Sequence, residues 1–205
     1  TEARFEAALQ YDLTLAAGGK TVTTGGQADT VTSGSGDDAV TLGAGQDTFE
    51  VAFGGAGTDT IVDFAGGASG DTFDFTGTTD VNDAAGADLD VDGFLLLAAG
   101  AHTIVDGLTV VSGAAGTATD AGTTLTAAEV ATFLGDMFGG GEAMTVATAA
   151  DVAYVLVEGD AGTSTLAQVT GGADTAIDTA DVTLIAHFTS LESEDFLAGN
   201  ASDFA

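Results

Sequence analysis

A nine-residue pattern that repeats from residue 24 constrains the fold more than any other feature of the sequence. Three consecutive segments read TGGQADTVT, SGSGDDAVT and LGAGQDTFE, and GGAGTDTIV and GGASGDTFD follow, each after a three-residue insertion. The sixth residue of every copy is aspartate and the eighth is apolar. A low-complexity glycine- and aspartate-rich loop region would not keep both positions in phase, so the pattern predicts a repeating architecture.

Each fixed position has a physical role. Glycine permits positive φ angles and the close approach of neighbouring loops. Aspartate supplies a hard, anionic oxygen, and loop carbonyls supply further oxygens, which together suit Ca²⁺ with its 6–8 oxygen ligands. The apolar residue two positions after the aspartate is expected on a short strand, pointing inward. Two nonapeptides would make one turn of a parallel β-roll, so that every second loop stacks on the same side.

Residues 24–75 resemble the RTX repeats of secreted bacterial toxins, serralysin-type proteases, lipases and surface-layer proteins. The resemblance implies that a calcium ion lies between stacked loops and takes an aspartate and carbonyls from each, with about three ions in all. It pairs Asp29 with Asp47, Asp38 with Asp59, and Asp47 with Asp71. The implied ligand residues are Asp29, Gly34, Gly36, Asp38, Gly43, Gly45, Asp47, Gly54, Gly55, Gly57, Asp59 and Asp71.

The charge of the chain excludes several classes of partner. Lysine and arginine number 2 against 32 acidic residues, and the formal net charge is −30. No cationic groove for nucleic acid can be built from Arg4 and Lys20, and charge attraction to anionic lipid is excluded for the same reason. Hydrophobic residues make up 45% of the chain, too many for a disordered acidic tail. A folded chain of this charge repels itself, and bound cations would relieve that repulsion.

The sequence outside the repeats predicts a mainly β protein: a short parallel β-roll followed by a β-rich C-terminal region with one helix. Residues 1–23 are expected to form a lead-in strand or helix, residues 24–76 the roll, and residues 77–205 the C-terminal region. Thr126 and Glu129 form a capping box that predicts a helix over 126–138 with an inward face that includes Phe133. Strands are expected at 93–98, 102–111, 151–157, 165–169 and 182–188.

The two ends of the chain bear on export. Acidic residues within the first 15 positions do not fit a signal peptide, and no apolar run approaches the roughly 18 residues of a membrane span. The hairpin pattern at 153–169, the strand at 182–188 and the segment SLESEDF resemble the C-terminal region of type I secreted proteins. That resemblance implies an uncleaved C-terminal export signal that the type I secretion machinery recognises, and an extracellular or cell-surface location.

Other candidate sites are weaker. Asp88, Asp90 and Asp92 match the first half of an EF-hand loop, but Ala99 stands where a bidentate glutamate is needed, so solvated strand-end residues are the favoured interpretation. His102 and His187 are isolated in apolar contexts, which favours structural roles over a zinc site. The chain has no cysteine, no H-E-x-x-H motif and no G-x-S-x-G motif, so no thiol, protease or lipase chemistry is indicated and an enzyme is not expected.

The favoured hypothesis is a calcium-dependent structural module that folds outside the cell and self-assembles into a surface layer, filament or matrix. The alternative is the C-terminal secretion module of a protease, lipase or toxin whose catalytic part is absent. An adhesin is less favoured, because aromatic residues make up 7% of the chain and tryptophan is absent. Adaptation to high salt would explain the acidity but not the phased aspartates.

Overall fold

The structure is a computed structural model of the whole chain. It describes residues 2–4, 9–52, 57–66, 70–76, 102–104, 107–111, 125–135, 144–146, 152–158, 162–171 and 176–191. The chain divides into two compact units, residues 1–79 with 186–205 and residues 80–185. The fold is mainly β, with parallel strands and one α-helix among the described residues.

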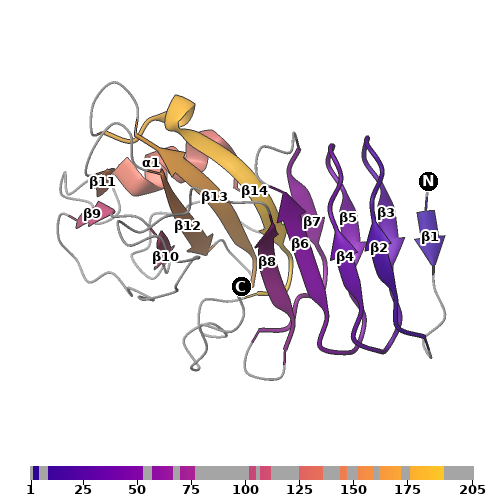
Figure 1. The fold of residues 1–205 in the computed structure, drawn as a ribbon. Helices are drawn as coiled ribbons and strands as arrows, with labels where there is room; N and C mark the ends of the chain where they lie inside the picture. The colour runs from indigo at the N-terminus through magenta and orange to yellow at the C-terminus, as the bar shows by residue number, and fades with distance from the viewer. Residues whose placement is uncertain are drawn as a thin grey trace. The chain divides into compact units, whose positions relative to one another are not determined.

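The first unit contains the repeats, and each repeat contributes one short strand. The strands are β1 (Glu2–Arg4), β2 (Asp12–Thr14), β3 (Thr21–Thr23), β4 (Thr30–Thr32), β5 (Ala39–Thr41), β6 (Thr48–Ala52), β7 (Asp59–Ile61) and β8 (Thr72–Thr76). Alternate strands join two parallel sheets, in the orders β1-β3-β5-β7 and β2-β4-β6-β8. Figure 1 shows these strands, coloured indigo to magenta, stacked side by side in chain order. This arrangement is the parallel β-roll that the nine-residue period predicts.

The apolar eighth position of each repeat forms the core of the roll. The valines at this position in β4 and β5, Val31 and Val40, are fully buried, as are Phe49, Ile61 and Phe73 in the following strands. Register explains the alignment, because Val31 pairs with Phe49 and Phe49 pairs with Phe73 across parallel neighbours. Side chains of the same repeat position therefore stack on one another inside the roll.

The roll begins earlier than the repeat pattern indicates. The expected lead-in, residues 1–23, supplies β1, β2 and β3, which pair in parallel with the strands one turn later. Leu13 and Val22 stand at the apolar position of two degenerate repeats whose sixth residues are Tyr11 and Lys20. Parallel pairing needs only backbone hydrogen bonds and an inward apolar side chain, so a repeat can lose its aspartate and keep its place.

The roll also recruits residues from the far end of the chain. Strand β14 (Val182–Phe188) ends in the first unit, where Ala186–Phe188 pair in parallel with β7. The ring of Phe188 packs edge-on against Phe64 and Phe73, with ring centroids 5.2 and 5.7 Å away. The N–H of Thr189 then donates to the Ile61 carbonyl at 3.0 Å. The chain divides at residue 79, close to the expected boundary at 77, but the expected region 77–205 is not one unit, because Ala186–Phe188 complete the roll.

The second unit contains a β-hairpin and the helix. Strands β12 (Val152–Glu158) and β13 (Ser164–Thr170) pair antiparallel, and β10 (Gly107–Val111) pairs in parallel with β12. Strands β9 (His102–Ile104) and β11 (Met144–Val146) form a separate parallel pair. A 3₁₀ turn, η1 (Thr179–Asp181), precedes β14. These elements confirm the strands expected at 151–157, 165–169 and 182–188. The region expected as one strand at 102–111 contains two, and the strand expected at 93–98 lies outside the described residues.

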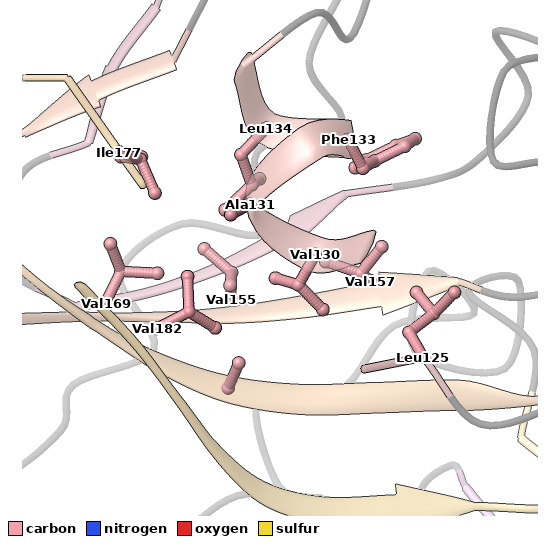
Figure 2. Packing of buried hydrophobic residues seen from close by; sticks show 11 residues of the cluster. Leu125, Val130, Ala131, Phe133, Leu134, Val155, Val157, Val169, Ile177 and Val182 are labelled. Carbon is pink, nitrogen blue, oxygen red and sulfur yellow. The ribbon is translucent and has the colours of Figure 1, made fainter. Parts of the chain in front are cut away.

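Helix α1 (Ala127–Gly135) begins with the predicted capping box. The Thr126 N–H donates to a Glu129 carboxylate oxygen at 2.7 Å, and the Glu129 N–H donates to the Thr126 hydroxyl at 3.3 Å. Val130, Phe133 and Leu134 are buried, which confirms the predicted inward face. Figure 2 shows Val130 on the side of the helix that faces valines of the strands beneath. Residues 136–138, the end of the helix expected over 126–138, lie outside the described residues. Among the residues that the structure describes, no helix is long and apolar enough to cross a membrane.

Candidate metal sites

The loops that precede the strands form two stacks within the roll. Residues 15–20 and 33–38 lead into β3 and β5, and residues 24–29 and 42–47 lead into β4 and β6. The later loops, 54–59 and 66–71, are described only in part, at 57–59, 66 and 70–71. Because strands of the same sheet are parallel and in register, the loop at 33–38 lies directly on the loop at 15–20, and the loop at 42–47 on the loop at 24–29.

Two glycines show how closely the loops approach. Gly36 has φ +111°, and a Cβ there would lie 2.8 Å from the Gly19 nitrogen of the loop below. Gly43 has φ +92°, and a Cβ there would collide with the Gly25 carbonyl oxygen. Both positions combine a left-handed conformation with backbone-to-backbone contact, which only glycine provides without strain. The backbones of neighbouring loops are consequently in direct contact on each side of the roll.

The repeat aspartates form two ladders that follow the loops. The Asp29 N–H donates to Asp47 Oδ1 at 2.6 Å, and the Asp47 N–H donates to Asp71 Oδ1 at 3.0 Å. On the other side, the Asp38 N–H donates to Asp59 Oδ1 at 3.0 Å. All five aspartates are at most 5% exposed. The structure therefore brings together the three aspartate pairs that the resemblance implies.

The second carboxylate oxygens differ in how they are satisfied. Asp29 Oδ2 accepts from the Gly25 N–H at 3.0 Å, Asp38 Oδ2 from Gly34 at 3.3 Å and Asp71 Oδ2 from Ala65 at 2.8 Å. Asp47 Oδ2 is buried and has no hydrogen-bond partner. An anionic oxygen removed from water without a partner costs several kcal/mol, of the order expected for a buried unpaired charge. A cation at this oxygen would remove that cost.

The electrostatics of the ladders favour proton or cation uptake. Burial, with the nearby charges of Asp71 and Asp29, raises the pKa of Asp47 to about 6. Burial, with the charge of Asp38, also raises the pKa of Asp59 to about 6. In both cases a backbone N–H bond works in the opposite direction and is outweighed. Ionisation of these two buried carboxyl groups at neutral pH thus costs the folded state free energy unless positive charge compensates it.

One carboxylate that the repeat pattern does not single out also organises a loop. Asp63 lies in the second three-residue insertion, and its two oxygens accept from Leu42 N–H at 2.7 Å and Gly43 N–H at 2.8 Å. These are the first two residues of the loop that ends at Asp47. The only sequence signal was an aspartate within an insertion, which by itself does not indicate which loop it contacts.

The remaining predicted ligands are placed unevenly. Gly34, Gly36, Gly43, Gly45 and Gly57 lie in the stacked loops, whereas Gly54 and Gly55 lie outside the described residues. No three carboxylate or imidazole side chains converge anywhere in the part of the chain that the structure describes. A cation in these loops would thus depend on backbone carbonyls, as the resemblance implies.

His187 is half-buried on β14, and its pKa is lowered by burial. The side chains of His102, Asp88, Asp90 and Asp92 are outside the described set.

Comparison with known proteins yields no relative. No protein-family model matches the chain, no curated protein is similar to it, and no solved structure matches its fold.

Proposed function

We propose that this protein is a calcium-binding structural module of an exported, extracellular or cell-surface protein, and that its β-roll folds as its loops take up Ca²⁺. The observation that carries the proposal is the buried, unpartnered Oδ2 of Asp47, which lies between two further aspartates of the same ladder. Desolvated negative charge stacked in this way is unfavourable in the protein alone and favourable around a divalent cation.

The donor chemistry supports Ca²⁺ over other metals. The loops offer carboxylate and carbonyl oxygens, whereas Zn²⁺ sites are dominated by the nitrogen and sulfur of histidine and cysteine. Mg²⁺ requires near-ideal octahedral geometry and keeps several waters, which a stack of backbone carbonyls does not favour. Asp29, Asp47 and Asp71 would hold ions on one side of the roll, and Asp38 and Asp59 would hold an ion on the other.

The same carboxylates couple folding to the calcium concentration. Without cations, the ladder aspartates repel one another in the stacked state and favour the open chain. With cations, the binding free energy adds to the folding free energy. A chain that stays open where Ca²⁺ is scarce and folds where it is plentiful suits export through a channel, which agrees with the type I secretion hypothesis.

The strand order gives the module a route to self-assembly. β1 and β2 stand at the ends of the two orders, each with one parallel neighbour. The terminal strands of a sheet offer unpaired backbone groups to a strand from another chain. We therefore propose a scaffold that assembles into a layer, filament or matrix, rather than an enzyme.

A calcium titration of the full chain tests both parts of the proposal. Circular dichroism reports folding and light scattering reports particles, each from EGTA to millimolar Ca²⁺. The expected result is a cooperative gain of β signal together with particle formation. Asp47→Asn is the site variant, and Asp12→Asn, at an exposed position, is the matched control. Folding without particles would refute the assembling scaffold and favour the tail of a secreted enzyme. Absence of bound metal at saturating Ca²⁺ would refute the calcium sites themselves.

A further inference from the structure

One lysine stands where the repeats place an aspartate. Lys20 is the sixth residue of the degenerate repeat at 15–23, one turn before Asp38. Its backbone N–H donates to Asp38 Oδ1 at 2.7 Å, the same bond that the Asp38 N–H makes to Asp59 Oδ1 at 3.0 Å. Lys20 therefore continues the ladder in backbone geometry while it reverses the charge of the side chain.

The ammonium group of Lys20 folds back onto the loop that leads to it. Nζ donates to the Ala17 carbonyl oxygen at 2.6 Å and also to the Gly18 carbonyl oxygen. Ala17 and Gly18 correspond, one turn later, to Ser35 and Gly36 in the loop that ends at Asp38. A positive charge is thus held by loop carbonyls, the groups that the proposed calcium sites use in the following loops.

The loop around Lys20 keeps the tight stacking of its neighbours. Gly18 has φ +77°, and its N–H donates to the Ser35 carbonyl at 2.5 Å. A Cβ at Gly19 would lie 2.6 Å from the Asp37 carbonyl oxygen in the loop above. The first loop on this side of the roll therefore has the conformation of a repeat loop without an aspartate of its own.

We propose that the Lys20 ammonium is a tethered cation that takes the place of Ca²⁺ in the first loop, so that this loop is ordered without a metal ion of its own. This inference rests on the proposed calcium function, which it deepens by assigning one loop a built-in charge. The occupancy of a loop by a covalently attached cation does not depend on ion concentration, whereas the occupancy of a calcium site does. The first loop is then ordered whenever the calcium-dependent turn that it contacts is folded.

The test compares three variants of the full chain. Lys20→Asp restores the repeat aspartate, and we expect it to bind one more Ca²⁺ per chain than the parent, measured by equilibrium dialysis and elemental analysis. Lys20→Met removes the charge but keeps the apolar stem, and it should bind no additional ion. Arg4→Met changes the net charge of the chain by the same amount as Lys20→Met and serves as the control.

Hydrogen exchange at saturating Ca²⁺, where the next turn is folded, gives a second readout that does not need a new ion to bind. The amides of Leu15 and Gly18, which donate to the Thr32 and Ser35 carbonyls, should be protected in the parent protein. Loss of the charged donor in Lys20→Met should speed their exchange about tenfold or more, as expected for a hydrogen bond to a charged group. Arg4→Met should leave their exchange unchanged.

The outcomes separate this inference from the function on which it rests. A parent protein that binds no Ca²⁺ overturns the proposed function. A parent that binds Ca²⁺ overturns only the present inference if Lys20→Asp gains no ion and Lys20→Met leaves exchange at Leu15 and Gly18 unchanged. Leu15 and Gly18 amides that are unprotected in the parent at saturating Ca²⁺ also overturn the inference, because Lys20 would then not order the first loop.

Discussion

Replacing Asp47 by asparagine should have opposite effects with and without calcium. The change keeps an oxygen that can accept the Asp29 N–H, now 2.6 Å from Oδ1, and removes the charge of the oxygen that has no partner. Without metal the variant should therefore be more stable than the parent protein. With metal it should bind fewer ions, because a neutral amide is a weaker ligand for a hard cation than a carboxylate.

The size of the expected gain in stability without metal follows from the raised pKa of Asp47. Burial moves the pKa of Asp47 from 3.8 to about 6. At about 1.4 kcal/mol per unit, this shift costs the folded state about 3 kcal/mol at pH 7.5, where the parent carboxyl must ionise. The new amide N–H₂ needs an acceptor in the same buried place, which offsets about 1 kcal/mol. The expected net gain in the free energy of unfolding is about 2 kcal/mol in EGTA.

The assay must report stability even where the metal-free roll is largely open. Circular dichroism along a co-solvent axis, from a folding osmolyte to urea, gives the free energy of unfolding at pH 7.5 in EGTA whether the folded or the open state dominates. Asp12→Asn, at an exposed position on β2, is the control for the loss of one negative charge. Lower stability of Asp47→Asn than of the control in EGTA, or an unchanged calcium stoichiometry, would refute the reasoning.

Four further predictions concern pH, the two cores and the stacked loops. In EGTA the roll should be more stable at pH 4.5 than at pH 7.5, because the folded-state pKa values of Asp47 and Asp59 are raised to about 6 and stability is lost as pH rises through them. A free energy of unfolding that increases from pH 4.5 to pH 7.5 in EGTA would contradict these pKa shifts. Phe188→Ala should destabilise the roll by about 3–5 kcal/mol, seen as a lower calorimetric midpoint in Ca²⁺, and an unchanged midpoint would show that the contacts to β7 and its neighbours do not form. Phe133→Ala should cost the second unit a similar amount, seen in urea unfolding followed by near-UV signals of that unit, and no change there would place the helix elsewhere. Gly43→Ala should reduce calcium affinity and roll stability together, with at least about 1–2 kcal/mol from the left-handed backbone alone, and normal titration would argue against the close loop contact.

Local patterns in the sequence were enough to predict several elements. The capping box at Thr126 and the apolar spacing that includes Phe133 predict α1, because helix initiation and its buried face depend on residues within one or two turns of each other. The strands of the hairpin are predicted by short apolar runs on either side of a turn. In each case the residues that interact are close together in the chain.

The candidate site was predictable only where the repeats keep their signature. The spacing of the aspartates implies which loops stack, and the structure places Asp29 with Asp47 and Asp38 with Asp59. The role of Asp63 in holding the loop at Leu42 was not predictable, because an insertion does not reveal which backbone groups it reaches. The burial that leaves Asp47 Oδ2 unpartnered likewise depends on every neighbouring loop at once.

The sequence by itself determined the period of the roll, its inward apolar positions and the ladder of aspartates, because each repeat has its aspartate and its apolar residue at the same positions of a turn and a strand. Only the tertiary structure decided where the roll begins and ends. Its first turn has Tyr11 and Lys20 in place of aspartate, and its last strand, Ala186–Phe188, comes from more than a hundred residues further along the chain. The hydrogen bonds that join parallel strands are made by backbone groups, so the side-chain pattern does not show which strand pairs with an end strand. The partner of an end strand is therefore settled by the packing of the whole unit.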